Sequence, residues 1–353
     1  MKISYRTTLQ AAVAFLAYAF LLSHTPAAPA EKALRVYFVD VEGGQATLFV
    51  TPEGESLLID TGWPGNNGRD ADRIIAAAKD AGIGKIDYVL ITHYHDDHVG
   101  GAPQLAAKIP IGTFIDHGVT RETDGNSPKL YDAYKALLDS GKYKHITAKP
   151  EDMLTIGSLR VKVVTSDGEV LKRALPEGGH ENPACNEPAP PADKTENPRS
   201  LGTLITLGNL KILDLGDLTA DKERDLMCPV NRLGKVDVYI ASHHGSFQSG
   251  SAVLVHAVSP RVAIVDNGEK KGGSPSALDI IKSSPELAGM WQLHFSEQAG
   301  AAHNAAPDFI ANLQGPDAGN YLKLTAWGDR SLEIFNSRTK RTEVYPRRPS
   351  GAD

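Results

Sequence analysis

Histidine and aspartate are concentrated in one short stretch of this 353-residue chain. Three histidines and two aspartates fall within six consecutive residues, at His93, His95, Asp96, Asp97 and His98. Neutral imidazole and carboxylate together favour zinc or a similar divalent ion, and the stretch contains no thiolate. His93 and His95 can point the same way at the end of a strand, whereas Asp97 and His98 point elsewhere as the chain bends. The spacing therefore indicates two adjacent metal ions.

The neighbours of this stretch argue against the alternative, a polar loop with incidental histidines. The apolar run Ile86–Thr92 directly before it predicts a buried strand, and Gly100 and Gly101 follow it. Imidazole and carboxylate groups this dense after a buried strand are costly to bury without a partner. We therefore expect them to bind metal.

The elements that must position these residues alternate between strands and helices. Apolar runs bounded by turn residues predict strands, and apolar residues at helical spacing predict helices. The expected strands cover 34–41, 46–50, 56–60, 86–92, 112–116, 159–165, 200–207, 210–215, 236–241, 261–265, 291–295 and a final hairpin over 321–336. The expected helices cover 69–81, 104–108, a segment that begins at 127, 220–227, 251–258 and 276–282. This order predicts an α/β fold.

Three further predicted strands end in residues of the same chemical types. Asp60 ends one strand, Asp217 follows a second, and His243 and His244 follow a third. Because these residues are spread so widely along the chain, one large domain over residues 31–353 is favoured over two smaller ones.

The stretch from His93 to His98 resembles the HxHxDH signature of the metallo-β-lactamase superfamily, a very specific motif. Asp60 matches the position of the first motif of that family, Asp217 lies in the Gly-Asp of its fourth, and His243-His244 matches its fifth. The resemblance covers roughly residues 34–265. It implies a four-layer αββα sandwich with the site at one edge of the two sheets.

Within that superfamily the chain is similar to the ComEC-type competence domains and their standalone relatives. Val39–Ala46 resembles their D-V-G-Q-G-D-A opening, Asn197–Ser200 their N-x-x-S, and His243–Ser246 their H-H-G-S. The opening departs from the pattern, because Glu42 intrudes and Ala46 stands where the acid would be.

Position by position, the resemblance implies two metal sites that share one bridging carboxylate. The implied ligands are His93 and His95 for the first metal, Asp97, His98 and one of His243 and His244 for the second, and Asp217 for both. Asp97, Asp217 and His244 are the expected catalytic residues. Asp60 would orient a ligand rather than bind metal. Zinc is the expected ion, one or two per chain, with manganese or iron as alternatives.

Asn197 stands where many members of the superfamily supply a further histidine to the first metal. Asparagine is a weaker ligand, so we expect the first site to be loose or to be filled from elsewhere. His117 and His180 are the candidates for that position. The alternative for each is an ordinary core or surface histidine.

The resemblance implies a metal-dependent hydrolase. Two ions would lower the pKa of a bridging water to about 7, which makes hydroxide available, and would polarise the oxygen under attack. The likeness to ComEC-type and phosphorylcholine-esterase-type domains favours a phosphoester or phosphodiester over an amide. A lactonase or β-lactam hydrolase is one alternative, and a degenerate, non-catalytic metal-binding domain is another. DNA handling in uptake would need transmembrane channel segments and a basic groove, which this sequence does not indicate.

Residues 1–30 have the layout of a secretory signal peptide. A basic start precedes an apolar stretch from Leu9 to Leu22, and small residues lead to Ala30. We expect cleavage after Ala30 and an exported chain, periplasmic or secreted, with no membrane segment after cleavage. An uncleaved membrane anchor is the alternative, although the apolar run is short for a span of about 20 residues.

If the chain is exported, its two cysteines, Cys185 and Cys228, can form a disulfide. An oxidising compartment lets an even pair close, so we predict a disulfide; two separate buried thiols are the alternative. The bond would close a loop of about 40 residues and contribute roughly 2–4 kcal/mol. Cys185 lies in the proline-rich segment 176–198, which we expect to be a long surface excursion, of the kind that often covers a site, rather than a disordered linker.

The charge balance limits the partners. The formal net charge is −6, and loss of residues 1–30 removes two positive charges and no acid, which leaves −8. An acidic body opposes binding to polyanions, so the expected partner is a small-molecule or phosphoester substrate rather than nucleic acid. Residues 338–353 concentrate basic side chains and are expected to form a solvated tail. The sequence gives no indication of an oligomeric state.

Overall fold

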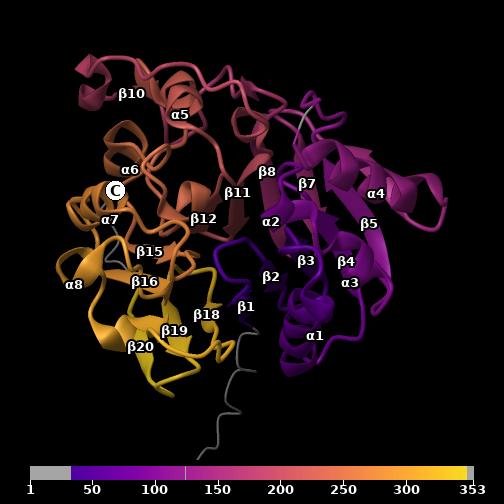
Figure 1. The fold of residues 1–353 in the computed structure, drawn as a ribbon. Helices are drawn as coiled ribbons and strands as arrows, with labels where there is room; N and C mark the ends of the chain where they lie inside the picture. The colour runs from indigo at the N-terminus through magenta and orange to yellow at the C-terminus, as the bar shows by residue number, and fades with distance from the viewer. Residues whose placement is uncertain (1–32, 124, 348–353) are drawn as a thin grey trace, which may run out of the picture. The chain divides into compact units, whose positions relative to one another are not determined.

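The computed structural model describes residues 33–123 and 125–347, and two nine-stranded sheets dominate this part of the chain (Figure 1). The signal peptide expected over residues 1–30 lies outside the described residues. In spatial order the first sheet contains β20 (Thr342–Tyr345), β19 (Leu332–Asn336), β18 (Leu322–Ala326), β1 (Leu34–Phe38), β2 (Thr47–Val50), β3 (Ser56–Ile59), β4 (Ile86–Leu90), β5 (Ile111–Asp116) and β6 (Lys144–Thr147).

The second sheet is built mainly from the C-terminal half of the chain. In spatial order it contains β17 (Ile310–Asn312), β16 (Gly289–His294), β15 (Val262–Val265), β14 (Val238–Ile240), β12 (Leu210–Asp214), β11 (Gly202–Leu207), β8 (Leu159–Ser166) and β7 (Met153–Ile156), with β9 (Glu169–Val170) paired to β8. A separate pair joins β10 (His180–Glu181) to β13 (Val230–Asn231). The helices are α1 (Arg69–Asp80), α2 (Asp96–Val99), α3 (Ala102–Ala106), α4 (Ser127–Asp139), α5 (Ala220–Met227), α6 (Ala252–Val258), α7 (Pro275–Lys282) and α8 (Gly300–His303).

Three hydrophobic clusters separate four layers. One cluster joins inward side chains of both sheets, among them Val36, Val161 and Ile264. The second lies between the first sheet and α1, α3 and α4, and the third between the second sheet and α5, α6 and α7. Figure 1 shows these two sets of helices on opposite outer sides of the paired sheets. The predicted αββα sandwich is confirmed.

Burial on both faces of the sheets explains why their strands have nearly continuous apolar sequences. In β1, Leu34, Val36 and Phe38 face the other sheet, whereas Tyr37 faces the helices. Successive side chains of a strand point to opposite faces, so a strand between two layers needs apolar residues at almost every position.

The carboxyl ends of parallel strands from both sheets converge on one edge. In the first sheet β3 runs parallel to β4, and in the second β12, β14 and β15 are parallel. Asp60 follows β3, the histidine stretch follows β4, and Asp217 follows β12. The backbone N–H of Leu201 donates to the carbonyl of Thr92 at 2.9 Å and ties the two sheets together here. This edge is where α/β folds commonly bind ligands.

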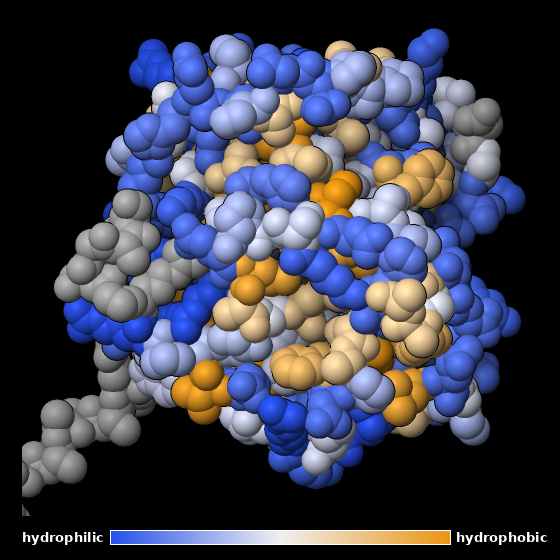
Figure 2. All heavy atoms as spheres, turned by 90° about the vertical axis from the view of Figure 1, so that its left-hand side faces the viewer, coloured by the Kyte–Doolittle hydropathy of each residue, from blue (hydrophilic) through white to orange (hydrophobic). Residues whose placement is uncertain are grey.

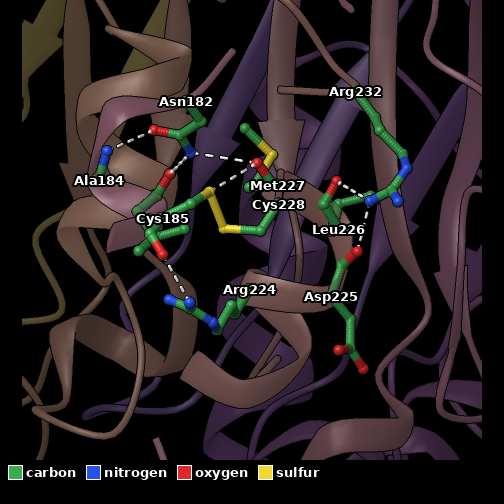
Figure 3. Close-up of a disulfide and its surroundings, with 10 residues drawn as sticks. Asn182, Ala184, Cys185, Arg224, Asp225, Leu226, Met227, Cys228 and Arg232 are labelled. Atoms are coloured by element: carbon green, nitrogen blue, oxygen red, sulfur yellow. Dashed lines mark hydrogen bonds between the residues drawn. A yellow bond between two sulfur atoms is a disulfide. The ribbon is translucent and has the colours of Figure 1, made fainter. Parts of the chain in front are cut away.

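The proline-rich segment 176–198 is anchored to α5 by the predicted disulfide. Cys185 and Cys228 are bonded, with their Cα atoms 5.7 Å apart (Figure 3). Arg224 of α5 donates to the carbonyl of Cys185 at 2.6 Å, and Asn182 donates to the carbonyl of Met227 at 3.2 Å. The disulfide prediction is confirmed, and these contacts exclude a free linker around Cys185.

The beginning of the expected basic tail is part of the first sheet. β20 pairs antiparallel with β19 from Thr342 to Tyr345, and the guanidinium of Arg338 donates to the carbonyl of Ile310 at 2.9 Å. Backbone pairing and side-chain hydrogen bonds therefore fix residues 338–345 against the first sheet. The solvated tail expected from residue 338 onward does not begin there.

One outer face of the described chain carries α6, α7 and α8. Figure 2 shows hydrophobic side chains interspersed with hydrophilic ones on this face. Among the helices that the structure describes, none combines the length and apolar character needed to cross a membrane.

Candidate metal centre

Four buried side chains converge on one point at the sheet edge. Asp97, His98, Asp217 and His244 each offer a ligand atom, and these atoms all lie within 4.8 Å of one another. Nε2 of His98 lies 3.2 Å from Oδ2 of Asp97 and 3.2 Å from Oδ1 of Asp217. It also lies 3.2 Å from Nε2 of His244. We call these four residues the second group, because they match the ligands expected for the second metal.

A neighbouring first group contains His93, His95 and Asp217, again with ligand atoms within 4.8 Å of one another. Nε2 of His93 lies 3.1 Å from Nδ1 of His95 and 3.8 Å from Oδ2 of Asp217. Asp217 thus belongs to both groups and presents a different oxygen to each. This is the arrangement expected of a carboxylate that bridges two ions.

Three carboxylates lie behind the histidine rings, and two of them, Asp60 and Glu122, hydrogen-bond to the ring nitrogens. Asp60 contacts Nδ1 of His98, Glu122 lies 3.3 Å from Nε2 of His95, and Asp266 lies 3.4 Å from Nδ1 of His244. In each case the opposite ring nitrogen faces a ligand group, and such outer carboxylates set the tautomer and raise the basicity of metal-binding histidines. Asp60 was predicted in this position.

Glu122 and Asp266 were not identified from the sequence. Asp266 directly follows the predicted strand 261–265, so its place at a strand end was a usable signal. Glu122 lies in a loop after β5 and had no comparable signal.

The backbone takes an unusual conformation at three site residues. Asp60, His243 and His244 have φ values of 59°, 54° and 54°, in the left-handed region that costs energy for residues other than glycine. Two backbone hydrogen bonds hold the turn at His243 and His244. The N–H of His243 donates to the carbonyl of Gly216, and the N–H of Gly273 donates to the carbonyl of His244. In this turn Nε2 of His243 lies 3.3 Å and Nε2 of His244 lies 3.4 Å from carboxylate oxygens of Asp217.

The site balances charge among its own side chains. Burial disfavours the charged form of His98, but Asp217 and Asp97 hold the pKa of His98 well above its usual value. Burial and the neighbouring His98 hold the pKa of His93 well below its usual value. Burial opposes ionisation of Asp97, yet His98 and Lys271 hold the pKa of that carboxyl well below its usual range. Burial and Lys271 oppose protonation of His244 as well, yet Asp217 and Asp266 raise the pKa of His244 to about 9. Two imidazoliums, His98 and His244, therefore stand among the carboxylates, and metal binding requires that both lose their protons.

Comparison with known protein families agrees with this geometry. The family model described as the metallo-beta-lactamase superfamily matches residues 39–265. The chain belongs to the metallo-β-lactamase superfamily. The predicted family is therefore confirmed.

Relatives of this chain include proteins named for recombination and for competence. Recombination protein 2 of Haemophilus influenzae is 27% identical over 232 residues, which cover 65% of this chain and 24% of that protein. Competence protein ComA of Neisseria gonorrhoeae is 24% identical over 255 residues, 72% of this chain and 30% of that protein. A metal-dependent hydrolase of Thermodesulfovibrio yellowstonii is 24% identical over 218 residues, 61% of this chain and 72% of that protein. The ComEC-type resemblance is confirmed at low identity, and the chain spans less than a third of the first two relatives.

The superfamily pattern left open which of the paired histidines faces the second metal. The geometry favours His244, whose Nε2 lies 3.0 Å from Oδ2 of Asp97. Nε2 of His243 instead lies 3.3 Å from Oδ2 of Asp217, and its Nδ1 lies 3.4 Å from the hydroxyl of Ser249. His243 contacts the shared carboxylate of Asp217 and belongs to neither ligand group.

The candidates for the third position of the first metal lie elsewhere among the described residues. Nε2 of His117 lies 2.8 Å from Oε1 of the buried Glu196, and its ring packs against Tyr94. His180 lies exposed on β10, and neither histidine belongs to a ligand group. Asn197 is buried, and its Oδ1 has no hydrogen-bond partner among the described residues.

The residues fit a dinuclear centre of borderline divalent ions. Oδ1 of Asp217 is buried and accepts no hydrogen bond within the described chain, although Nε2 of His98 is 3.2 Å away. A bound cation would satisfy these crowded ligand atoms and the acceptor that has no donor. Imidazole and carboxylate together suit zinc, manganese or iron.

Proposed function

We propose that the chain is an exported metal-dependent hydrolase of phosphoesters or phosphodiesters. One observation carries the hydrolase proposal, namely that two ligand groups share Asp217 and present separate oxygens of that carboxylate to each group. Paired divalent ions are a recurring solution for displacements at phosphorus. The choice of phosphoester rests on the resemblance to ComEC-type domains, and therefore on analogy.

Divalent ions bound here would supply a nucleophile from water near neutral pH and stabilise charge on the oxygens of the scissile group. The side chains of the protein position the ligand atoms. Asp217 fixes the spacing of the two groups, and Asp60 and Glu122 keep the rings of His98 and His95 in their ligating orientation. Burial of these side chains lowers the local dielectric, which strengthens every charge interaction with the substrate.

The disulfide supports export. Disulfides persist in oxidising compartments and are rare in the cytosol, and the Cys185–Cys228 bond joins the proline-rich segment to α5. Together with the layout of residues 1–30, this favours a periplasmic or secreted protein.

Hydrolysis of an aryl phosphodiester, a chromogenic cephalosporin and a simple lactone by the purified chain tests the proposal. We expect phosphodiester hydrolysis that a chelator abolishes and that added zinc or manganese restores. Faster turnover of the lactone or cephalosporin would reassign the substrate class. Fewer than one ion per chain, with no activity restored by metal, would identify a non-catalytic binding domain.

A further inference from the structure

A lysine lies at the mouth of the second group. Nζ of Lys271, in the loop between β15 and α7, forms an ion pair with Oδ2 of Asp97. It also donates to the carbonyl of Gly43 at 2.9 Å and lies 5.2 Å from the centroid of the Trp63 ring. The Lys271 side chain is 36% exposed and that of Asp97 only 8%, so the ammonium lies on the solvent side of the carboxylate.

The loop that carries this lysine is fixed to a ligand residue. The N–H of Gly268 donates to the carbonyl of Lys271 at 2.8 Å, and the N–H of Gly273 donates to the carbonyl of His244 at 2.8 Å. A Cβ on Gly272 would lie only 2.2 Å from that same carbonyl, so the loop packs directly against the turn at His244. The position of Lys271 is therefore coupled to the metal-binding turn.

The ammonium and a metal ion compete for one carboxylate oxygen. Oδ2 of Asp97 faces both His98 and His244, at 3.2 Å and 3.0 Å, so it is the oxygen that an ion in the second group would take. Two positive charges this close repel each other strongly in a buried site. The carbonyl of Gly43 and the ring of Trp63 would keep the displaced ammonium at the mouth, where it needs a new anionic partner.

We propose that Lys271 binds a non-bridging oxygen of the phosphoester substrate at the entrance to the second group. The inference rests on the proposed function and assigns a substrate-binding residue to it. Ammonium-to-phosphate contacts are strong because both partners are charged. Among the described residues, Asp97 and Asp217 form ion pairs with histidines and with one other residue, Lys271. Lys271 therefore supplies the permanent positive charge beside these two carboxylates.

The test compares Lys271→Met and Lys271→Arg with Lys270→Met in the full chain. Lys270 is the exposed neighbour, so its replacement removes the same charge one residue away. We measure ions bound per chain, the affinity of the metal-loaded protein for inorganic phosphate by calorimetry, and KM and kcat for an aryl phosphodiester. The Lys271→Met variant should bind phosphate about tenfold more weakly and show a similar rise in KM at unchanged metal content, as loss of a charge-assisted hydrogen bond predicts. The Lys270→Met variant should match the wild type, and Lys271→Arg should recover most of the affinity.

Two outcomes overturn the proposal. If the Lys271→Met variant binds phosphate as well as the wild type does, Lys271 only neutralises Asp97 and takes no part in recognition. If Lys270→Met weakens binding equally, the effect is one of general charge. Failure of the proposed function is separate, because a wild type that binds phosphate but hydrolyses no phosphodiester would refute the activity and leave the phosphate comparison intact.

Discussion

Oδ2 of Asp60 lies 2.7 Å from Nδ1 of His98, and both side chains are fully buried. The same carboxylate accepts hydrogen bonds from the hydroxyl of Thr92 at 2.7 Å and from its N–H at 2.8 Å. With three contacts the carboxylate cannot rotate, and Nε2 of His98 is held facing Asp97 and Asp217. The pair thus orients the ligand around which the second group is built.

Asp60→Asn should weaken metal binding without unfolding the chain. Asparagine tolerates the left-handed backbone at this position. It replaces the charged oxygen that faces Nδ1 of His98 with a neutral amide group. Metal affinity should fall by about 10- to 100-fold, as is typical for loss of an outer carboxylate. Metal titration against Asp72→Asn, an exposed aspartate paired with Lys108, provides the control. Equal affinities in the two variants would contradict the role assigned to Asp60.

The two adjacent histidines should differ in their effect on metal content. Both have left-handed backbones, which asparagine accommodates, so His244→Asn and His243→Asn are matched substitutions. At equal free metal, the His244→Asn protein should bind one ion fewer than the wild type, whereas His243→Asn should keep the full complement. Elemental analysis decides, and the reverse result would assign His243 to the second group.

Removing the disulfide should lower stability and leave the metal centre intact. Replacing both Cys185 and Cys228 with serine frees a loop with a sequence separation of 43 residues, and the expected loss is about 2–4 kcal/mol of unfolding free energy. Urea unfolding measures the loss, and metal content is the control. An unchanged midpoint would mean that the other contacts of Asn182 and Arg224 suffice.

Glu223 should make stability depend on pH. Burial raises the pKa of Glu223 to about 7, against opposing hydrogen bonds from Ser251 and Gly250. Because the folded-state pKa lies above the ordinary value of 4.5, the contribution of this group is fully present below pH 4.5 and is lost as pH rises through about 7. The difference amounts to roughly 3 kcal/mol at most.

The matching variant is Glu223→Gln, which stays neutral at every pH. Unfolding free energies of both proteins, measured with chelator from pH 4 to 8, should show the wild type losing stability relative to the variant as pH rises. A constant difference between the two curves would show that Glu223 does not titrate in this range.

Local sequence patterns were sufficient to predict the central strands of both sheets and the residues that make up the two ligand groups. Strands such as β4 and β12 are buried on both faces, so their apolar runs stand out, and turn residues mark where they end. β6 was missed because Lys144, His145 and Thr147 are exposed and no apolar pattern marks the strand. Its place comes from pairing with β5, which only the assembled sheet reveals.

Contacts between distant loops were out of reach. The amide of Gln45 donates to Oδ2 of Asp214 at 2.6 Å across 169 positions, which joins the opening loop to the Gly-Asp turn. Lys271 and Glu122 likewise approach the centre only because loops fold over the sheet edge. Distance along the chain carries no signal for such pairs, whereas the density of His93–His98 was local and therefore visible.

The sharing of Asp217 between the two ligand groups also has a thermodynamic consequence. His93 and His98 follow a strand of the first sheet, and Asp217 and His244 follow strands of the second, so an ion held by both sets clasps the two halves of the sandwich. The unfolded chain offers no comparable set of ligands. An ion that binds only the native state stabilises that state, and the stabilisation grows with the logarithm of the ion concentration. If the chain is exported as proposed, the concentration of divalent ions outside the cytosol would then set the stability of the fold as well as the occupancy of the site.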